Sequence, residues 1–166
     1  MEKIKEEFIS ESREQLPCVS KIITSNELLD LIYKGESLPQ DNRFLPIEEG
    51  GVFKYFNIDD LTRTHNEKKF YPLIEVNKQV IALSELEENP YQQKSFWIKF
   101  VSVDPRYQNL GYASKLAEEI VRFAKKKDFS LESSSRSEEG YLKLKSLFDR
   151  LTKQYSVHYI DKDKKL

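Results

Sequence analysis

Cysteine, glycine and long apolar runs are all scarce in this chain of 166 residues. Cys18 is the single cysteine, so the sequence can form neither an intrachain disulfide nor a zinc site built from cysteines. No stretch approaches the roughly 20 apolar residues that cross a bilayer. The charged start MEKIKEEFISES is unlike a secretory signal. We therefore expect a cytoplasmic protein without a membrane partner.

Positive and negative charges are also nearly balanced in the sequence. The chain holds 27 basic and 28 acidic residues and has a net charge of −1. This balance argues against a nucleic acid as partner, because phosphate binding depends on positive charge. With 39% hydrophobic residues, the composition is that of a globular protein. The length predicts a single domain over 1–166, which we divide into an N-terminal part, 1–70, and a core, 71–160.

The first half of the core reads as three strands. Tyr71–Val76 and Gln79–Leu86 are rich in β-formers, and Asn77-Lys78 between them suits a tight hairpin. Ser95–Val103 is aromatic and β-branched, and Asp104-Pro105 stops it. Short links between successive strands predict an antiparallel meander.

The second half of the core alternates helices and short strands. One helix face follows the spacing i, i+3, i+4, i+7, i+8 and i+11, through Ala113, Leu116, Ala117, Ile120, Val121 and Ala124. Phe129–Ser133 then reads as a strand, and Ser135 with Glu138 has capping-box spacing before a second helix. Val157–Ile160 reads as the last strand. In the N-terminal part, we expect Asn26 to cap a helix over Glu27–Lys34.

Only five glycines occur, and Gly111 stands at the most informative place. A strand ends at Pro105, and the run from Gln108 to Ala113 opens the amphipathic helix. The first N–H groups of a helix have no intrahelical partner and carry partial positive charge, and Gly111 would let an anion approach the backbone. The turn is neither a P-loop nor a dinucleotide fingerprint, because it has one glycine. From these residues alone, an anion cradle and an ordinary strand-to-helix turn both remain open.

The longer run decides between them. It matches the motif V-x-V-x-P-x-x-[QR]-x-x-G-x-[GA] at every defined position, from Val101 through Val103, Pro105, Gln108 and Gly111 to Ala113. This run resembles the acetyl-CoA motif of the GNAT N-acetyltransferase superfamily, and the order of elements over roughly 71–160 is similar to that family. The resemblance implies an α/β (α+β) fold. Its mixed, mostly antiparallel sheet would have splayed central strands flanked by helices.

The resemblance also implies an activity and a binding site. The activity would be transfer of an acetyl group from acetyl-CoA, as co-substrate, to a primary amine of a small molecule or protein, with no metal. Backbone groups of Val101 and Val103 would hold the pantetheine arm. The pyrophosphate would lie on the N–H groups of the turn, which come from Gln108, Asn109, Leu110, Gly111, Tyr112, Ala113 and Ser114.

The catalytic groups are less well defined. A protonated amine has to lose a proton before it attacks, and a carboxylate can take that proton through water. Among the strand glutamates we favour Glu85, which ends the strand before the motif strand, followed by Glu132. The family's tyrosine, which protonates the leaving thiolate, would fall at Phe148. Tyr141 or Tyr155 could substitute for it, or the thiolate could leave unassisted or take a proton from water.

Two further interpretations stay open. The phenylalanine at 148 would suit a non-catalytic module that only binds CoA, and a toxin-like or inhibitor-like acetyltransferase could modify one protein target. The sequence does not define the acceptor amine, although 1–70 would shape its site, and a homodimer is left open. We expect His65 and His158 to be polar surface residues and Cys18 to be incidental.

Overall fold

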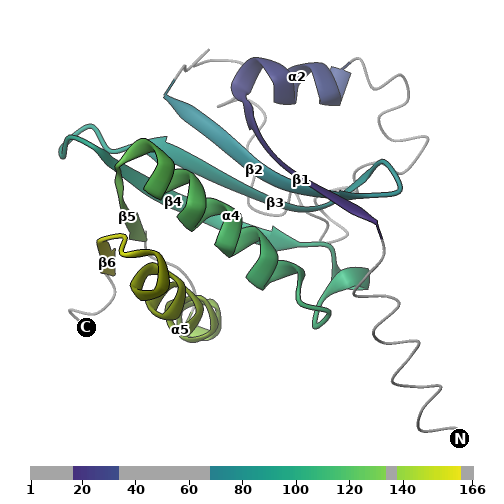
Figure 1. The fold of residues 1–166 in the computed structure, drawn as a ribbon. Coiled ribbons are helices and arrows are strands. Elements are labelled where there is room, and N and C mark those ends of the chain that lie inside the picture. Colours follow the sequence, from purple (N-terminus) through teal and green to yellow (C-terminus); the bar gives the residue numbers. More distant parts are fainter. Residues whose placement is uncertain (1–16, 34–67, 134–137, 162–166) are drawn as a thin grey trace, which may run out of the picture.

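The computed structural model describes residues 17–33, 68–133 and 138–161. Within these residues, six strands form one sheet in their sequence order (Figure 1). The first three pairings are antiparallel, and the last two, between β4 and β5 and between β5 and β6, are parallel. The elements are β1 (Cys18–Thr24), α2 (Ser25–Tyr33), β2 (Lys69–Val76), β3 (Gln79–Glu88), β4 (Ser95–Val103), α4 (Tyr112–Lys127), β5 (Ser130–Ser133), α5 (Glu138–Tyr155) and β6 (Tyr159–Asp161).

The sequence pattern placed most of these elements correctly. The meander of β2, β3 and β4 and the α4, β5, α5, β6 order are confirmed, with boundaries that differ by a few residues. Asn77 and Lys78 have φ of 51° and 65°, as a type I′ hairpin turn requires of both central residues. The predicted cap Ser135 lies outside the described residues.

The start of α2 differs from the prediction. The cap is Thr24 and not Asn26: Thr24 Oγ1 accepts from the Glu27 N–H at 3.2 Å, and the Thr24 N–H donates to Glu27 Oε1 at 3.0 Å. This reciprocal pair is a capping box. It lets α2 begin at Ser25, immediately after β1, a strand that the sequence pattern had not indicated.

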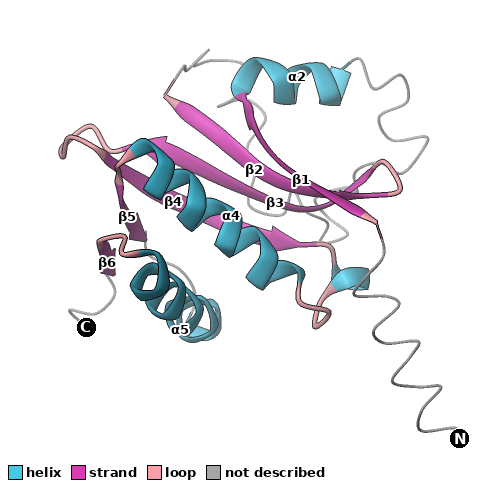
Figure 2. Ribbon diagram, viewed as in Figure 1, coloured by secondary structure: helices cyan, strands magenta, loops and turns pink. Residues whose placement is uncertain are grey.

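Helices cover the two faces of the sheet differently. On β2, the consecutive residues Leu73 and Ile74 belong to different buried clusters, as alternating strand residues must. Leu73 packs with Leu28 of α2, and Ile74 packs with the apolar stripe of α4. Figure 2 shows α4 crossing in front of the strands, with α5 next to it. Both belong to parallel crossovers, which place them on one face.

The central strands part halfway along β4. β5 pairs with β4 only from Ser95 to Ile98, whereas β4 continues to Val103. At the same level a β-bulge interrupts the β3–β4 ladder, because Glu85 pairs with Phe100 and Leu86 with Ile98. Lys99 is therefore the extra residue, and such a bulge bends its strand. The sheet has the splayed centre that the resemblance implied.

No helix in the described ranges is both long and apolar enough to cross a membrane.

Candidate functional site

The site begins where β4 turns into α4. Asp104 follows the strand and is almost completely buried, and its Oδ1 accepts from the Arg106 backbone N–H at 2.9 Å. The Arg106 guanidinium also donates to Asp104 Oδ2 at 2.8 Å. Farther along, Gln108 Nε2 donates to the Val103 carbonyl at 3.1 Å. Side chains thus hold the loop against the end of β4.

Gly111 is required by the backbone conformation of this loop. Its φ is +91°, in the left-handed region that L-residues rarely adopt. A Cβ atom built there would meet no atom within 4 Å, so crowding is not the reason for the glycine. The space in front of the backbone is open at this point, as an approaching anion would need.

The first backbone amides of α4, directly after Gly111, have no hydrogen-bond acceptor within the helix. Lys115 makes the first intrahelical bond of α4, from its N–H to the Gly111 carbonyl at 3.1 Å. The N–H groups of Ala113 and Ser114 precede it and have no carbonyl of the helix to donate to. Among the described residues, no side chain caps this end of α4. The arrangement combines these amides with the positive end of a helix dipole, which favours a phosphate group.

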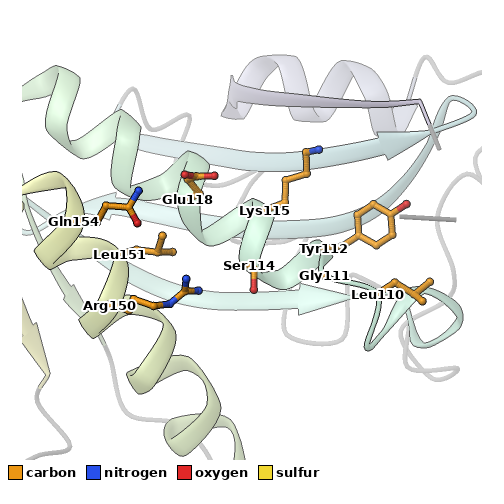
Figure 3. A pocket seen from close by; sticks show the side chains of 9 residues that line it. All are labelled: Leu110, Gly111, Tyr112, Ser114, Lys115, Glu118, Arg150, Leu151 and Gln154. Atoms are coloured by element: carbon orange, nitrogen blue, oxygen red, sulfur yellow. The ribbon is translucent and has the colours of Figure 1, made fainter. Parts of the chain in front are cut away.

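A pocket of about 450 Å³ opens beside this turn, between α4 and α5. Figure 3 shows the Arg150 side chain extending from α5 toward α4, while Lys115 extends away from α5. Sequence reasoning missed Arg150, because only the packing of α5 on α4 brings it to the motif turn. The lining residues are Leu110, Gly111, Tyr112, Ser114, Lys115, Glu118, Arg150, Leu151 and Gln154.

The open edge of β4 leads to this pocket. The Asp104 N–H donates to the Ile81 carbonyl of β3 at 2.8 Å. Since backbone groups alternate sides along a strand, Ser102 also faces β3, and Val101 and Val103 face the opposite way. In the described pairing no β5 residue lies opposite Val101 or Val103. Their backbone groups therefore border the gap between the splayed strands.

Glu85 lies on the sheet face that is turned away from α4. It pairs with Phe100 at the bulge, one residue from Val101. Its side chain is 12% exposed, and Lys69 Nζ lies 3.9 Å from Glu85 Oε2. Burial raises the pKa of the Glu85 carboxyl, while the Lys69 charge and the Tyr71 hydroxyl oppose that rise. A carboxylate with a raised pKa, one strand away from the gap, is suited to accept a proton.

Glu132 has a different environment. It is buried on β5, where its Oε2 accepts hydrogen bonds from the Asn89 side chain at 2.6 Å and from the Trp97 indole N–H. These contacts tie β5 to the start of β4 and to the loop before it. The geometry favours Glu85 over Glu132 as a proton acceptor, because the Glu132 oxygen is already occupied by two donors.

The positions considered for protonation of the thiolate have different surroundings. Phe148 is fully buried and stacks on Tyr159, with ring centroids 5.7 Å apart. The Tyr155 hydroxyl donates to Glu118 Oε2 at 2.6 Å and accepts from Arg122 Nε at 3.1 Å, so it joins α5 to α4. Tyr141 lies in α5, and its side chain is outside the described residues.

The remaining sequence candidates lie apart from this site. His158 is exposed just before β6, Cys18 is half-buried at the start of β1, and His65 is outside the described residues. Among the residues that the structure describes, no group of three or more His, Cys, Asp and Glu side chains could hold a metal ion.

Comparison with known proteins identifies the class to which this fold and turn belong. A sequence model of the acetyltransferase (GNAT) family matches residues 33–141. The chain belongs to the GNAT acetyltransferase family, and it is an acetyl-CoA-dependent acyltransferase. None of the curated protein sequences matches it.

Solved structures agree on the fold. The ribosomal-protein-S18-alanine N-acetyltransferase of Escherichia coli is similar with a TM-score of 0.58 and 14% identity, over 81% of this chain and 76% of that one. An IAA acetyltransferase from Bacillus cereus gives 0.52 and 17%, over 81% and 75%. An aminoglycoside acetyltransferase from an uncultured soil metagenomic sample gives 0.52 and 14%, over 79% and 86%. At these identities the likeness concerns the fold alone.

Proposed function

We propose that this chain transfers the acetyl group of acetyl-CoA to a primary amine of a small molecule or protein, with Glu85 as the proton acceptor. The observation that carries the proposal is the continuous path from the uncapped start of α4 to the open edge of β4. Glu85 lies beside the far end of this path.

The two ends of acetyl-CoA suit the two ends of the path. The pyrophosphate would accept hydrogen bonds from the amides between Gln108 and Ser114, where the helix dipole is favourable. Arg150 lines the same pocket and can add a charge-assisted hydrogen bond to a phosphate oxygen. The pantetheine arm carries amide groups, which can pair with the backbone of Val101 and Val103 in the manner of a strand.

The chemical step then needs three contributions. The amine nitrogen attacks the thioester carbon, and a C–N bond forms as the C–S bond breaks. In this proposal the backbone N–H of Val101 stabilises the negative charge that develops on the carbonyl oxygen. The proton that the ammonium has to lose passes through water to the Glu85 carboxylate. The nitrogen loses its second proton as the amide forms, and the leaving thiolate gains one proton, so each turnover releases one net proton to solvent. We assign no side chain to the protonation of the thiolate, and Tyr141 stays a prediction for that role.

The first test is binding. Isothermal titration with acetyl-CoA should give a saturable signal for the wild-type chain. Gly111→Glu should bind about a hundredfold more weakly or worse, because a carboxylate next to the pyrophosphate repels it by several kcal/mol.

Gly111→Ala is the matched control for this variant. It has the same backbone strain, but its methyl group meets nothing within 4 Å, so it should keep affinity within about tenfold of the wild type. Equal losses in the two variants, or normal binding by Gly111→Glu, would contradict the assignment of the cradle.

The second test is turnover. Release of free CoA thiol should depend on an added amine from a panel of diamines, amino sugars and peptides with free N-termini. Glu85→Gln should remove most of that release at neutral pH while acetyl-CoA still binds. Binding without amine-dependent thiol release from any acceptor would count against the proposed reaction.

A further inference from the structure

Two residues of β2 face Glu85 from inside the protein. Lys69 is only 6% exposed, which is rare for a lysine unless it is paired. Tyr71, two residues along the same strand, is completely buried. Both side chains lie on the face that carries Glu85, because alternate residues of a strand share a face.

Lys69 and Tyr71 both act on one carboxylate. Lys69 Nζ lies 3.9 Å from Glu85 Oε2, and the two side chains are 8% and 12% exposed. Tyr71 is buried on the same face, and its hydroxyl lowers the pKa of the Glu85 carboxyl. A buried cation therefore lies in reach of Glu85 from β2, with a buried phenol two residues along the same strand. The bulge in β4 lies on the other side of Glu85.

The other charged groups near Glu85, Glu87 and Lys99, form an ion pair with each other. Glu87 follows on β3, and Lys99 of β4 places its Nζ 3.8 Å from Glu87 Oε1 and 5.0 Å from the centre of the Trp97 ring. The Lys99 side chain is also far more exposed than that of Lys69. Lys69 is thus the buried cation in direct reach of Glu85 among the described residues.

We propose that Lys69 and Tyr71 are positioning residues that keep the Glu85 carboxylate ionised and directed toward the bulge of β4. This inference rests on the proposed role of Glu85. Neither residue transfers a proton in the reaction. Glu85 gains one proton from the acceptor ammonium in each turnover and returns it to solvent.

The physical need for such residues follows from the burial of Glu85. Burial raises the pKa of Glu85, and the negative charge of Glu87 raises it further. The Lys69 charge, the Tyr71 hydroxyl and Lys99 lower it. Without them the pKa of the Glu85 carboxyl would rise further, which would leave less of the carboxylate form to accept a proton. Burial and the Glu85 charge also raise the pKa of Tyr71, which therefore stays a neutral donor throughout the assay range.

The experiment is a pH profile of kcat/KM, with acetyl-CoA and an accepted amine, for wild type, Lys69→Met, Lys69→Arg and Tyr71→Phe. In wild type, activity should fall with decreasing pH as Glu85 is protonated. Lys69→Met should move this acid limb up by about one pH unit or more, since an opposite charge at this range shifts a carboxyl pKa by 1–3 units. At a pH where activity still rises with pH, this shift lowers kcat/KM about tenfold. At high pH, where activity no longer changes, kcat/KM stays near its wild-type value.

The other variants separate charge from packing. Lys69→Arg keeps the charge and should return the midpoint of the acid limb to its wild-type pH. Tyr71→Phe should raise that midpoint by a smaller amount than Lys69→Met. Lys21→Met is the matched control, because Lys21 of β1 lies 2.6 Å from a different carboxylate, that of Glu75 on β2. It should leave the limb in place. A lowered plateau with an unmoved limb in Lys69→Met and Tyr71→Phe would mean a structural role and would overturn the inference.

A second readout does not need activity. Carboxyl-carbon NMR of protein labelled at glutamate, with Glu85→Gln used for assignment, follows the titration of Glu85 directly. The Glu85 resonance should titrate at higher pH in Lys69→Met and Tyr71→Phe than in wild type, and unchanged midpoints would overturn the inference. If Lys69→Met does not fold, Lys69→Arg and Tyr71→Phe decide the question. Absence of acetyl transfer in wild type together with shifted midpoints would refute the proposed function and leave the tuning of Glu85 intact.

Discussion

Phe148 occupies a position that leaves little room for a polar group. Its ring is completely buried, inclined 26° to the ring of Tyr159 in a stacked pair, and surrounded by the apolar cluster under α4 and α5. A hydroxyl at this position would need a partner that the apolar surroundings do not offer.

Phe148→Tyr should therefore lower the free energy of unfolding by about 1–3 kcal/mol, the usual cost of burying an unmatched hydroxyl. Urea denaturation followed by circular dichroism measures the change. The opposite outcome would be informative: a variant as stable as wild type with a higher kcat would mean that the new hydroxyl reaches the leaving sulfur.

At the scale of elements, the β2–β3 hairpin has a turn that is strained at Lys78. Both central residues have positive φ, and Asn tolerates this conformation far better than Lys. Lys78→Gly should raise the free energy of unfolding by about 0.5–1 kcal/mol, because Asn-Gly suits a type I′ turn.

The control for the hairpin is the same exchange in the last turn of a helix. Lys126→Gly in α4 should lower the free energy of unfolding, by at most about 1 kcal/mol, since glycine is a poor helix former. Urea denaturation of both variants gives the two signs. Destabilisation by Lys78→Gly would mean that the lysine side chain contributes more than its backbone strain costs.

Local patterns predicted the elements whose signal lies within one segment. The apolar stripe from Leu116 to Ala124 and the motif from Val101 to Ala113 are both continuous in sequence, and the structure has them as a buried helix face and a strand–turn–helix. The box formed by Thr24 and Glu27 was equally local, and its T-x-x-E spacing could have been recognised.

The rest of the site depends on register and packing. Lys69, Tyr71 and Glu85 come together because β2 and β3 pair in one particular register, which their separate sequences do not specify. Arg150 joins the motif turn because α5 packs on α4. The two hydrogen bonds that Glu132 accepts come from Asn89 and Trp97, which lie outside β5. No pattern within a single segment carries these contacts.

For the whole molecule, the parting of β4 from β5 creates an edge inside the sheet. Val101 and Val103 face this edge, whereas Ser102 and Asp104 face β3. Amide hydrogen exchange resolved by NMR should therefore alternate along the strand in the free protein, fast at Val101 and Val103 and slow at Ser102 and Asp104. Acetyl-CoA should slow the first pair strongly and leave the second pair almost unchanged. Equal protection of all four amides in the free protein would contradict the orientation of the strand.

An interior edge also affects how the free protein behaves in solution. Unpaired strand amides can pair with other chains, and proteins usually cover such edges. If acetyl-CoA lies along β4, it acts as a transient strand that closes the sheet from within. The co-substrate would then protect the chain against self-association as well as take part in the reaction, and the aggregation rate at a fixed protein concentration would fall as acetyl-CoA is added.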